Sequence, residues 1–287
     1  RRHPGPTPRP AAIAMGLWQR GSATRLTHMK TALILASVLV LLAAAPGTTA
    51  AGYAKFKPGK SSLRVPTSAR QSSADELRWR LHSREIPGKF DISKERFELI
   101  IPPDYSHEKS YGLFIWISPG NQPAIPRDWL PVLAAEKLIF VGAVNSGNKR
   151  PIFDRMRMAI DVNHHLRSTF NIDPQRVYIS GFSGGGRVSS MLGVCYADMF
   201  PRTIPFMGVN YYKQVPGEKG RVFNPSYIPD EQVLQIARRS CRYVLVTGEK
   251  DFNRVNTKSM FENGFQKDGF KFVRYVEIPK VAHALPR

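Results

Sequence analysis

The segment from Arg176 to Arg187 restricts the fold of this chain more than any other part of its sequence. It reads Arg-Val-Tyr-Ile-Ser-Gly-Phe-Ser-Gly-Gly-Gly-Arg, an apolar strand that runs through a glycine-flanked serine into a helix. Glycines on both sides of Ser183 predict a sharp turn, because larger side chains there would collide with the strand and the helix packed beside it. A buried strand that passes directly into a helix is typical of α/β proteins.

Strand and helix patterns alternate along the rest of the chain as well. Short runs rich in β-branched and aromatic residues predict strands at 96–101, 113–118, 138–144, 176–180, 204–208, 243–247 and 272–278. Apolar residues at helical spacing predict helices at 127–136, 152–169, 184–196, 230–239 and 257–268. We therefore expect one α/β domain over residues 77–287, with a mostly parallel central sheet and helices on both faces.

The first fifty residues have a different composition from the rest. Residues 1–28 contain four prolines, five arginines and no acidic residue, so we expect a non-native upstream segment outside the fold. Residues 29–50 contain one lysine, then an apolar run, then small uncharged residues, which is the layout of a signal peptide. The apolar run is shorter than the roughly 20 residues of a spanning helix. We expect an exported protein, periplasmic or secreted, rather than one with a stable membrane span.

Residues 51–76 are rich in serine and basic side chains and poor in large apolar groups, so we expect a flexible basic leader. With a formal net charge of +20 on the whole chain, this leader could contact an anionic surface such as a cell envelope. A solvated basic tail is the simpler interpretation. Aromatic residues are not interleaved with the charges, as they are in nucleic-acid platforms, so we expect no nucleic-acid partner.

Cys195 and Cys241 are the only two cysteines. In an exported protein they can form a disulfide, and two buried free thiols are the alternative. Neither cysteine has metal-ligand spacing or lies beside a histidine in sequence. We therefore expect no metal site and no catalysis by cysteine.

Ser183 is the candidate nucleophile of the chain. A G-x-S-x-G pattern between a strand and a helix exposes the hydroxyl above the sheet and directs the amide of Gly184 to where an oxyanion would form. The alternative is a loop that binds phosphate at the start of the helix. The segment lacks the lysine and hydroxyl residue of a P-loop and the spacing of a dinucleotide fingerprint, so we expect no cofactor.

A serine hydroxyl becomes a nucleophile when a base removes its proton, and the base needs a carboxylate to orient it. In this type of fold both follow the serine in sequence, in loops after later strands. Asp251 follows the predicted strand 243–247 and is the expected acid, with Glu249 in the same loop as the alternative. His283 follows the last predicted strand. It is the only one of the seven histidines in the required order, so it is the expected base.

A second oxyanion donor is expected in the loop after the predicted strand 113–118. Pro119 opens this loop and has no N–H to donate. The expected donor is therefore the amide of Gly120, with Asn121 as the alternative. The same residues could also form nothing more than a tight turn.

Residues 172–187 resemble the nucleophile turn and lead-in of α/β-hydrolase esterases of the polyhydroxybutyrate-depolymerase-like and feruloyl-esterase-like branch. The resemblance extends from about Pro87 to the end of the chain. It implies a serine hydrolase that cleaves carboxylic esters through an acyl-enzyme, without a cofactor, and often an exported enzyme acting on polymer or plant-wall esters. The roles it implies are those of nucleophile for Ser183, acid for Asp251 and base for His283.

The chain departs from that family's pattern in two places. Ser118-Pro119-Gly120 stands where His-Gly is usual, and Ala282 precedes the histidine where glycine is common. A C-terminal helix would follow the histidine in this family, so we expect that the sequence is truncated there. A peptidase or acyltransferase on the same fold is an open alternative, as is a catalytically idle hydrolase fold that binds an envelope component or a carbohydrate.

Overall fold

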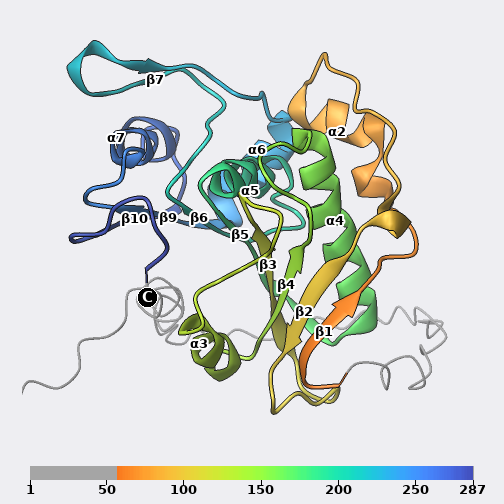
Figure 1. Ribbon diagram of the computed structural model, residues 1–287. Helices are drawn as coiled ribbons and strands as arrows, with labels where there is room; N and C mark the ends of the chain where they lie inside the picture. The colour runs from red at the N-terminus through yellow and green to blue at the C-terminus, as the bar shows by residue number, and fades with distance from the viewer. Residues whose placement is uncertain (1–56, 287) are drawn as a thin grey trace, which may run out of the picture.

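The structure is a computed structural model that describes residues 57–286, drawn in colour in Figure 1. The predicted upstream segment (1–28) and signal peptide (29–50) lie outside the described residues, as do residues 51–56 of the predicted leader. Within the described part, none of the helices is both long enough and apolar enough to cross a membrane.

An eight-stranded sheet lies at the centre of the molecule, in the order β1-β2-β4-β3-β5-β6-β9-β10. Its strands are β1 (Gly59–Leu63), β2 (Phe97–Ile101), β3 (Tyr111–Ile117), β4 (Leu138–Ala143), β5 (Ile172–Phe182), β6 (Arg202–Phe206), β9 (Arg242–Gly248) and β10 (Phe272–Ile278). From β4 to β10 every neighbouring pair is parallel, whereas β1 and β2 join the edge antiparallel. The prediction of a mostly parallel sheet is confirmed.

Helices cover the two faces of this sheet unequally (Figure 1). They are α2 (Ala74–Leu81), α3 (Trp129–Ala135), α4 (Ile152–Thr169), α5 (Gly184–Cys195), α6 (Glu231–Ser240) and α7 (Arg254–Ser259). The predicted helix at 257–268 begins three residues earlier and continues after α7 as the π-helix η5 (Met260–Phe265). A small hairpin of β7 (Val215–Pro216) and β8 (Val222–Phe223) stands apart from the main sheet.

Alternate residues of the central strands feed two separate hydrophobic clusters. In β3, Leu113 and Ile115 pack in the larger cluster with α4 and α5, whereas Phe114 and Trp116 pack in the smaller cluster with α3. Because successive side chains of a strand point to opposite faces, a strand buried on both faces reads as a continuous apolar run. This is why the central strands could be recognised from the sequence.

Residues 59–76 differ from the predicted flexible leader. β1 pairs with β2 in antiparallel register from Gly59 to Leu63, and Ala69 and Ser72 donate hydrogen bonds to a buried carboxylate on α4. The prediction is wrong for this part of the chain. Of the five residues in β1 only Leu63 is buried, so this edge strand has none of the apolar alternation that marks a strand in sequence.

Both cysteines are buried and free, so the alternative of two free thiols holds and the disulfide does not. Cys241 contacts the carbonyl oxygen of Ala197 with its sulfur at 3.3 Å. Burial raises the pKa of Cys195 well above its usual value and that of Cys241 to about 12. Thiols with such pKa values are protonated at neutral pH and therefore unreactive.

Candidate active site

Ser183 lies in the turn between β5 and α5, at the carboxyl end of a central strand. Its φ of 55° and ψ of −117° form a backbone conformation that residues with a side chain rarely adopt. The flanking glycines allow the turn to close. A Cβ atom on Gly185 would collide with the carbonyl oxygen of Ile117, and one on Gly181 would lie 2.5 Å from the Gly185 carbonyl. The predicted steric reason for the glycines is confirmed.

The three side chains predicted to act together are in hydrogen-bond contact. His283 Nε2 lies 2.9 Å from Ser183 Oγ, and His283 Nδ1 lies 2.7 Å from Asp251 Oδ1. For Nε2 to accept the proton of the serine hydroxyl, Nδ1 must carry the ring proton and donate it to the carboxylate. The chain Ser–His–Asp is therefore complete in this structure, although its members lie 100 and 32 residues from the histidine in sequence.

Asp251 is held in place by the loop that follows β9. Thr247 Oγ1 donates a hydrogen bond of 2.9 Å to Asp251 Oδ2, and the amide of Asn253 donates one of 3.1 Å to Oδ1. The carboxylate is completely buried, whereas the imidazole of His283 is 21% exposed. A buried carboxylate with several fixed donors stays in one orientation, which in turn fixes the orientation of the histidine.

Glu249, the alternative acid, contacts the backbone of the loop that carries His283 instead of the imidazole. Its Oε2 accepts a hydrogen bond of 2.6 Å from the amide of Lys280, which begins the loop that carries His283. Gly248 lets the same loop pack against the end of β9, because a Cβ atom there would collide with the carbonyl oxygen of Val281. The structure places Asp251, and not Glu249, against the imidazole.

A hydrogen-bonded link between α5 and the loop after β9 was not predicted from the sequence. Arg187, in the first turn of α5, donates a hydrogen bond of 3.0 Å to Asn253 Oδ1, and Asn253 Nδ2 donates to the carbonyl of Met207 at 2.8 Å. Desolvation lowers the pKa of Arg187, and the negative charge of Asp251 opposes that effect. An arginine four residues after the serine was the only sequence signal for this connection.

Gly184 and Gly120, the two predicted oxyanion donors, have different surroundings. Gly184 is the first residue of α5, where a helix leaves its amide without an internal partner. The Gly120 amide donates a hydrogen bond of 3.1 Å to Ser118 Oγ. Among the hydrogen bonds of residues 57–286, none uses the Asn121 amide as donor. The loop is itself anchored, since Arg155 donates to the carbonyl of Ser118 at 3.0 Å.

Two phenylalanine rings flank the imidazole of His283. The Phe182 ring centroid lies 4.8 Å from that of the imidazole, and the Phe252 centroid lies 4.0 Å from it with the rings tilted by 32°. Phe182 is partly buried in the smaller hydrophobic cluster. Phe252 directly follows the acid and is 72% exposed. The imidazole of His283 therefore contacts two aromatic rings, of which the Phe252 ring is largely exposed to solvent.

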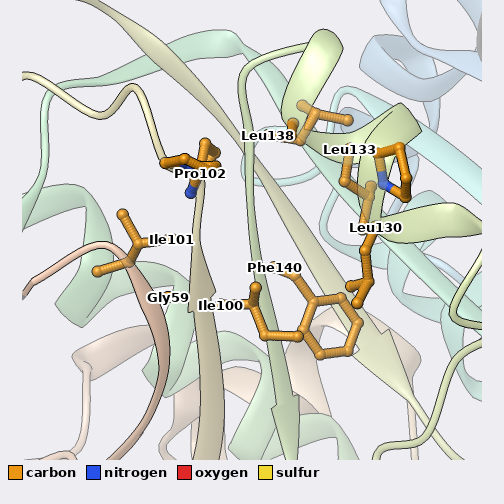
Figure 2. Close-up of a pocket in the computed structure, with 11 residues that line it drawn as sticks. Gly59, Ile100, Ile101, Pro102, Leu130, Leu133, Leu138 and Phe140 are labelled. Atoms are coloured by element: carbon orange, nitrogen blue, oxygen red, sulfur yellow. The ribbon is translucent and has the colours of Figure 1, made fainter.

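An apolar cavity, drawn in Figure 2, lies toward one edge of the sheet, whereas Asp251 and His283 follow β9 and β10 toward the other edge. It has a volume of about 270 Å³ and lies between α3 and the strands β1, β2 and β4. Leu138, at the start of β4, and Ile101, at the end of the antiparallel β2, both line it, so it faces the amino ends of the parallel strands. No titratable side chain lines this cavity. Residues 57–286 also contain no cluster of three His, Cys, Asp or Glu side chains that could hold a metal ion.

No family model matches this sequence, and no curated protein matches it. Solved structures similar to this one include a thermostable esterase, at 18% identity and a TM-score of 0.45, over 65% of this chain and 51% of that one. A variant of the feruloyl esterase module from Clostridium thermocellum, complexed with sinapinate, has 16% identity and a TM-score of 0.47, over 66% and 77%. Est1E from Butyrivibrio proteoclasticus has 16% identity and a TM-score of 0.46, over 68% and 88%.

The fold is that of the α/β hydrolases. In this chain the parallel strands from β4 to β10 and the strained serine turn between β5 and α5 provide its two defining parts. Asp251 and His283 follow β9 and β10, so the aspartate and the histidine come after the serine in the chain order that is usual in this fold. The predicted fold class is confirmed.

Proposed function

We propose that this protein is a serine esterase that hydrolyses carboxylic esters through an acyl-enzyme. The observation that supports this most strongly is the continuous hydrogen-bonded chain from Ser183 Oγ through His283 to Asp251 at the carboxyl edge of the sheet. A fold that had lost its activity would not need to keep a strained serine in contact with an imidazole, because strain of this kind costs of order 1–3 kcal/mol. The intact chain therefore favours an enzyme over an idle hydrolase fold.

In the proposed first step, Ser183 Oγ bonds to the carbonyl carbon of the ester while its proton passes to His283 Nε2. Asp251 stabilises the resulting imidazolium. The tetrahedral oxyanion accepts hydrogen bonds from the Gly184 amide and from a second amide. The bond to the alcohol then breaks, and the departing oxygen takes the proton from Nε2.

In the second step a water molecule replaces the serine as nucleophile. His283 takes one proton of the water, the hydroxide bonds to the acyl carbon, and Ser183 leaves with the proton that the imidazole returns. The products are a carboxylic acid and free enzyme. The same histidine therefore acts in both steps, whereas the alcohol part of the substrate takes part in the first step alone.

The second oxyanion donor is the amide of Gly120, with Asn121 as the alternative. Gly120 can serve once Ser118 Oγ rotates away from it, because the hydroxyl is the present acceptor of its N–H. Replacing Ser118 by alanine removes that competing acceptor. If Gly120 is the donor, the Ser118→Ala variant should turn over esters at least as fast as the wild type.

The natural ester and the site of action belong to the proposal too. The resemblance of residues 172–187 supports polyhydroxyalkanoate-type or polysaccharide-linked esters, and the composition of residues 29–50 supports export to the periplasm or the medium. A panel that includes a soluble hydroxyalkanoate oligomer and a feruloylated sugar separates these ester classes. Hydrolysis of a peptide substrate at a comparable kcat/KM would favour a peptidase instead.

The decisive experiment replaces Ser183 by alanine in the full chain. We expect the kcat for p-nitrophenyl butyrate to fall by about 10⁴-fold or more, because the nucleophile is lost. The melting temperature should not change, because the substitution removes no packing contact. A fluorophosphonate probe should label the wild type and not the variant. Ser168→Ala, which removes an exposed hydroxyl at the carboxyl end of α4, just before the amino end of β5, is the matched control. Persistent turnover in Ser183→Ala, or a wild type that the probe does not label, would refute the proposal.

A further inference from the structure

Phe252 is the most exposed large apolar side chain in the described part of the chain, and it lies beside the base. It is 72% exposed, yet its ring packs against the imidazole of His283 in a tilted arrangement with centroids 4.0 Å apart. A single exposed phenylalanine needs no explanation by itself. A phenylalanine that packs against the proposed general base and is still largely exposed to solvent is, however, accessible to a bound substrate.

The part of the substrate that it can contact follows from the path of the proton. In the proposed mechanism His283 Nε2 protonates the departing alcohol oxygen, so this oxygen must come within hydrogen-bond distance of the imidazole. The group attached to that oxygen therefore lies next to whatever surrounds the ring. Phe182 is partly buried in the core, so the ring that remains accessible to the alcohol is Phe252.

We propose that Phe252 forms a subsite for the alcohol part of the ester, and that this subsite favours alcohols with a flat apolar face. The inference rests on the proposed esterase function. An aromatic ring packs best against another ring or against the C–H face of a cyclic group, and pairs of aromatic rings contribute about 0.5–1.5 kcal/mol beyond the area they bury. Phenols and sugars both present such a face, so each needs its own ester in the test.

A positioning role for Phe252 makes a different prediction, and the two-step mechanism separates it from the subsite. A ring that only orients His283 would matter in acylation and in deacylation, whatever the alcohol is. A ring that contacts the alcohol matters in acylation alone, because every acetate ester gives the same acyl-enzyme. Esters with one acyl group and several alcohols therefore distinguish the two roles.

The test compares the full-length wild type with Phe252→Ala on methyl acetate, phenyl acetate and a methyl glucoside carrying one acetyl group. We expect kcat/KM to fall about tenfold for phenyl acetate, which corresponds to the upper part of the stacking contribution, and less than twofold for methyl acetate. A loss on the glucoside as well extends the subsite to sugars, and a loss on the phenyl ester alone restricts it to aromatic alcohols. For an ester whose kcat is limited by deacylation, the Phe252→Ala variant and the wild type should have the same kcat.

Two further variants serve as controls. Phe252→Tyr keeps the flat ring and should keep most of the preference for phenyl over methyl acetate. Phe272→Ala removes another exposed phenylalanine, which lies at the amino end of β10 and therefore away from the site. This variant should have the wild-type kcat/KM for both esters. Equal losses of kcat/KM on methyl and phenyl acetate, or no loss on either, would overturn the subsite. A wild type that is inactive on every ester would refute the esterase proposal itself.

Discussion

Two buried aspartates of this molecule have opposite settings. Asp251 lies in a loop at the carboxyl edge of the sheet, where an imidazole, a hydroxyl and a backbone amide contact its oxygens. Asp161 lies within α4 and is 1% exposed. Its Oδ1 accepts hydrogen bonds from the Ala69 amide at 2.7 Å and from Ser72 Oγ at 2.5 Å. One carboxylate contacts an imidazole, and the other attaches residues 69–72 to a helix.

The contrast shows that burial of a carboxylate says little about its task. Burial raises the pKa of Asp161, and the hydrogen bonds from Ser72 and Ala69 oppose that effect. Neither the Ser72 hydroxyl nor the Ala69 amide exchanges a proton near neutral pH. Their hydrogen bonds to Asp161 therefore attach residues 69–72 to α4. Asp251 contacts an imidazole, which can both accept and donate a proton, and that imidazole contacts the Ser183 hydroxyl. The partner of a buried carboxylate, rather than its depth, is therefore the reason why we propose Asp251 and not Asp161 as the catalytic acid.

The largest expected effect comes from Asp251→Asn. The amide keeps the size of the side chain but favours the imidazole tautomer with its proton on Nε2, which cannot accept the proton of Ser183. We expect the kcat for p-nitrophenyl butyrate to fall by about 10⁴-fold while the melting temperature changes little. Asp161→Asn is the matched control and should keep the wild-type kcat. An Asp251→Asn variant with activity within tenfold of the wild type would remove Asp251 from the mechanism.

A smaller effect, on stability rather than activity, is expected from Asp161→Ala. The change leaves the buried Ala69 amide without its acceptor, whereas Ser72 Oγ can still donate to the Ala69 carbonyl, which lies 2.8 Å away. An orphaned buried donor costs about 1–3 kcal/mol. Urea unfolding should therefore show a loss of about 1–3 kcal/mol, with kcat within twofold of the wild type under conditions where the variant is folded. Asp104→Ala, at an exposed aspartate, should leave the unfolding free energy nearly unchanged. A lower kcat at full folding would mean that Asp161 acts on the site after all.

The same contrast explains which parts could be predicted from the sequence. Ser183 was recognisable because its turn requires glycines at fixed positions, and Asp251 and His283 because the fold sets their order and each follows an apolar strand. These are local signals. β1 could not be recognised, since an edge strand with one buried residue has a polar sequence, and so the attachment of residues 59–76 was missed.

Asp161 and Phe252 could not be found for a different reason. In sequence, Asp161 looks like a polar residue on a helix, and its burial depends on residues 69–72, about 90 positions earlier. Phe252 looks like an ordinary apolar residue, and only the packing of the β9 and β10 loops brings it against His283. Properties that depend on two distant segments meeting have no signature in either segment alone.

The smallest expected effect is a pH dependence of the difference in unfolding free energy between the wild type and the Asp161→Asn variant. Because burial raises the pKa of this carboxyl above 3.8 in the folded state, the folded protein binds the proton more tightly than the unfolded chain does. The tighter proton binding contributes to the unfolding free energy. This contribution is fully present below pH 3.8 and is lost as the pH rises through the folded-state pKa of Asp161. The amide of the Asp161→Asn variant does not titrate, so the unfolding free energy of this variant minus that of the wild type should increase as the pH is raised from about 3.5 to about 7. Urea unfolding at several pH values measures this difference, and a difference that decreases with rising pH would show that the hydrogen bonds, rather than burial, control the charge of Asp161.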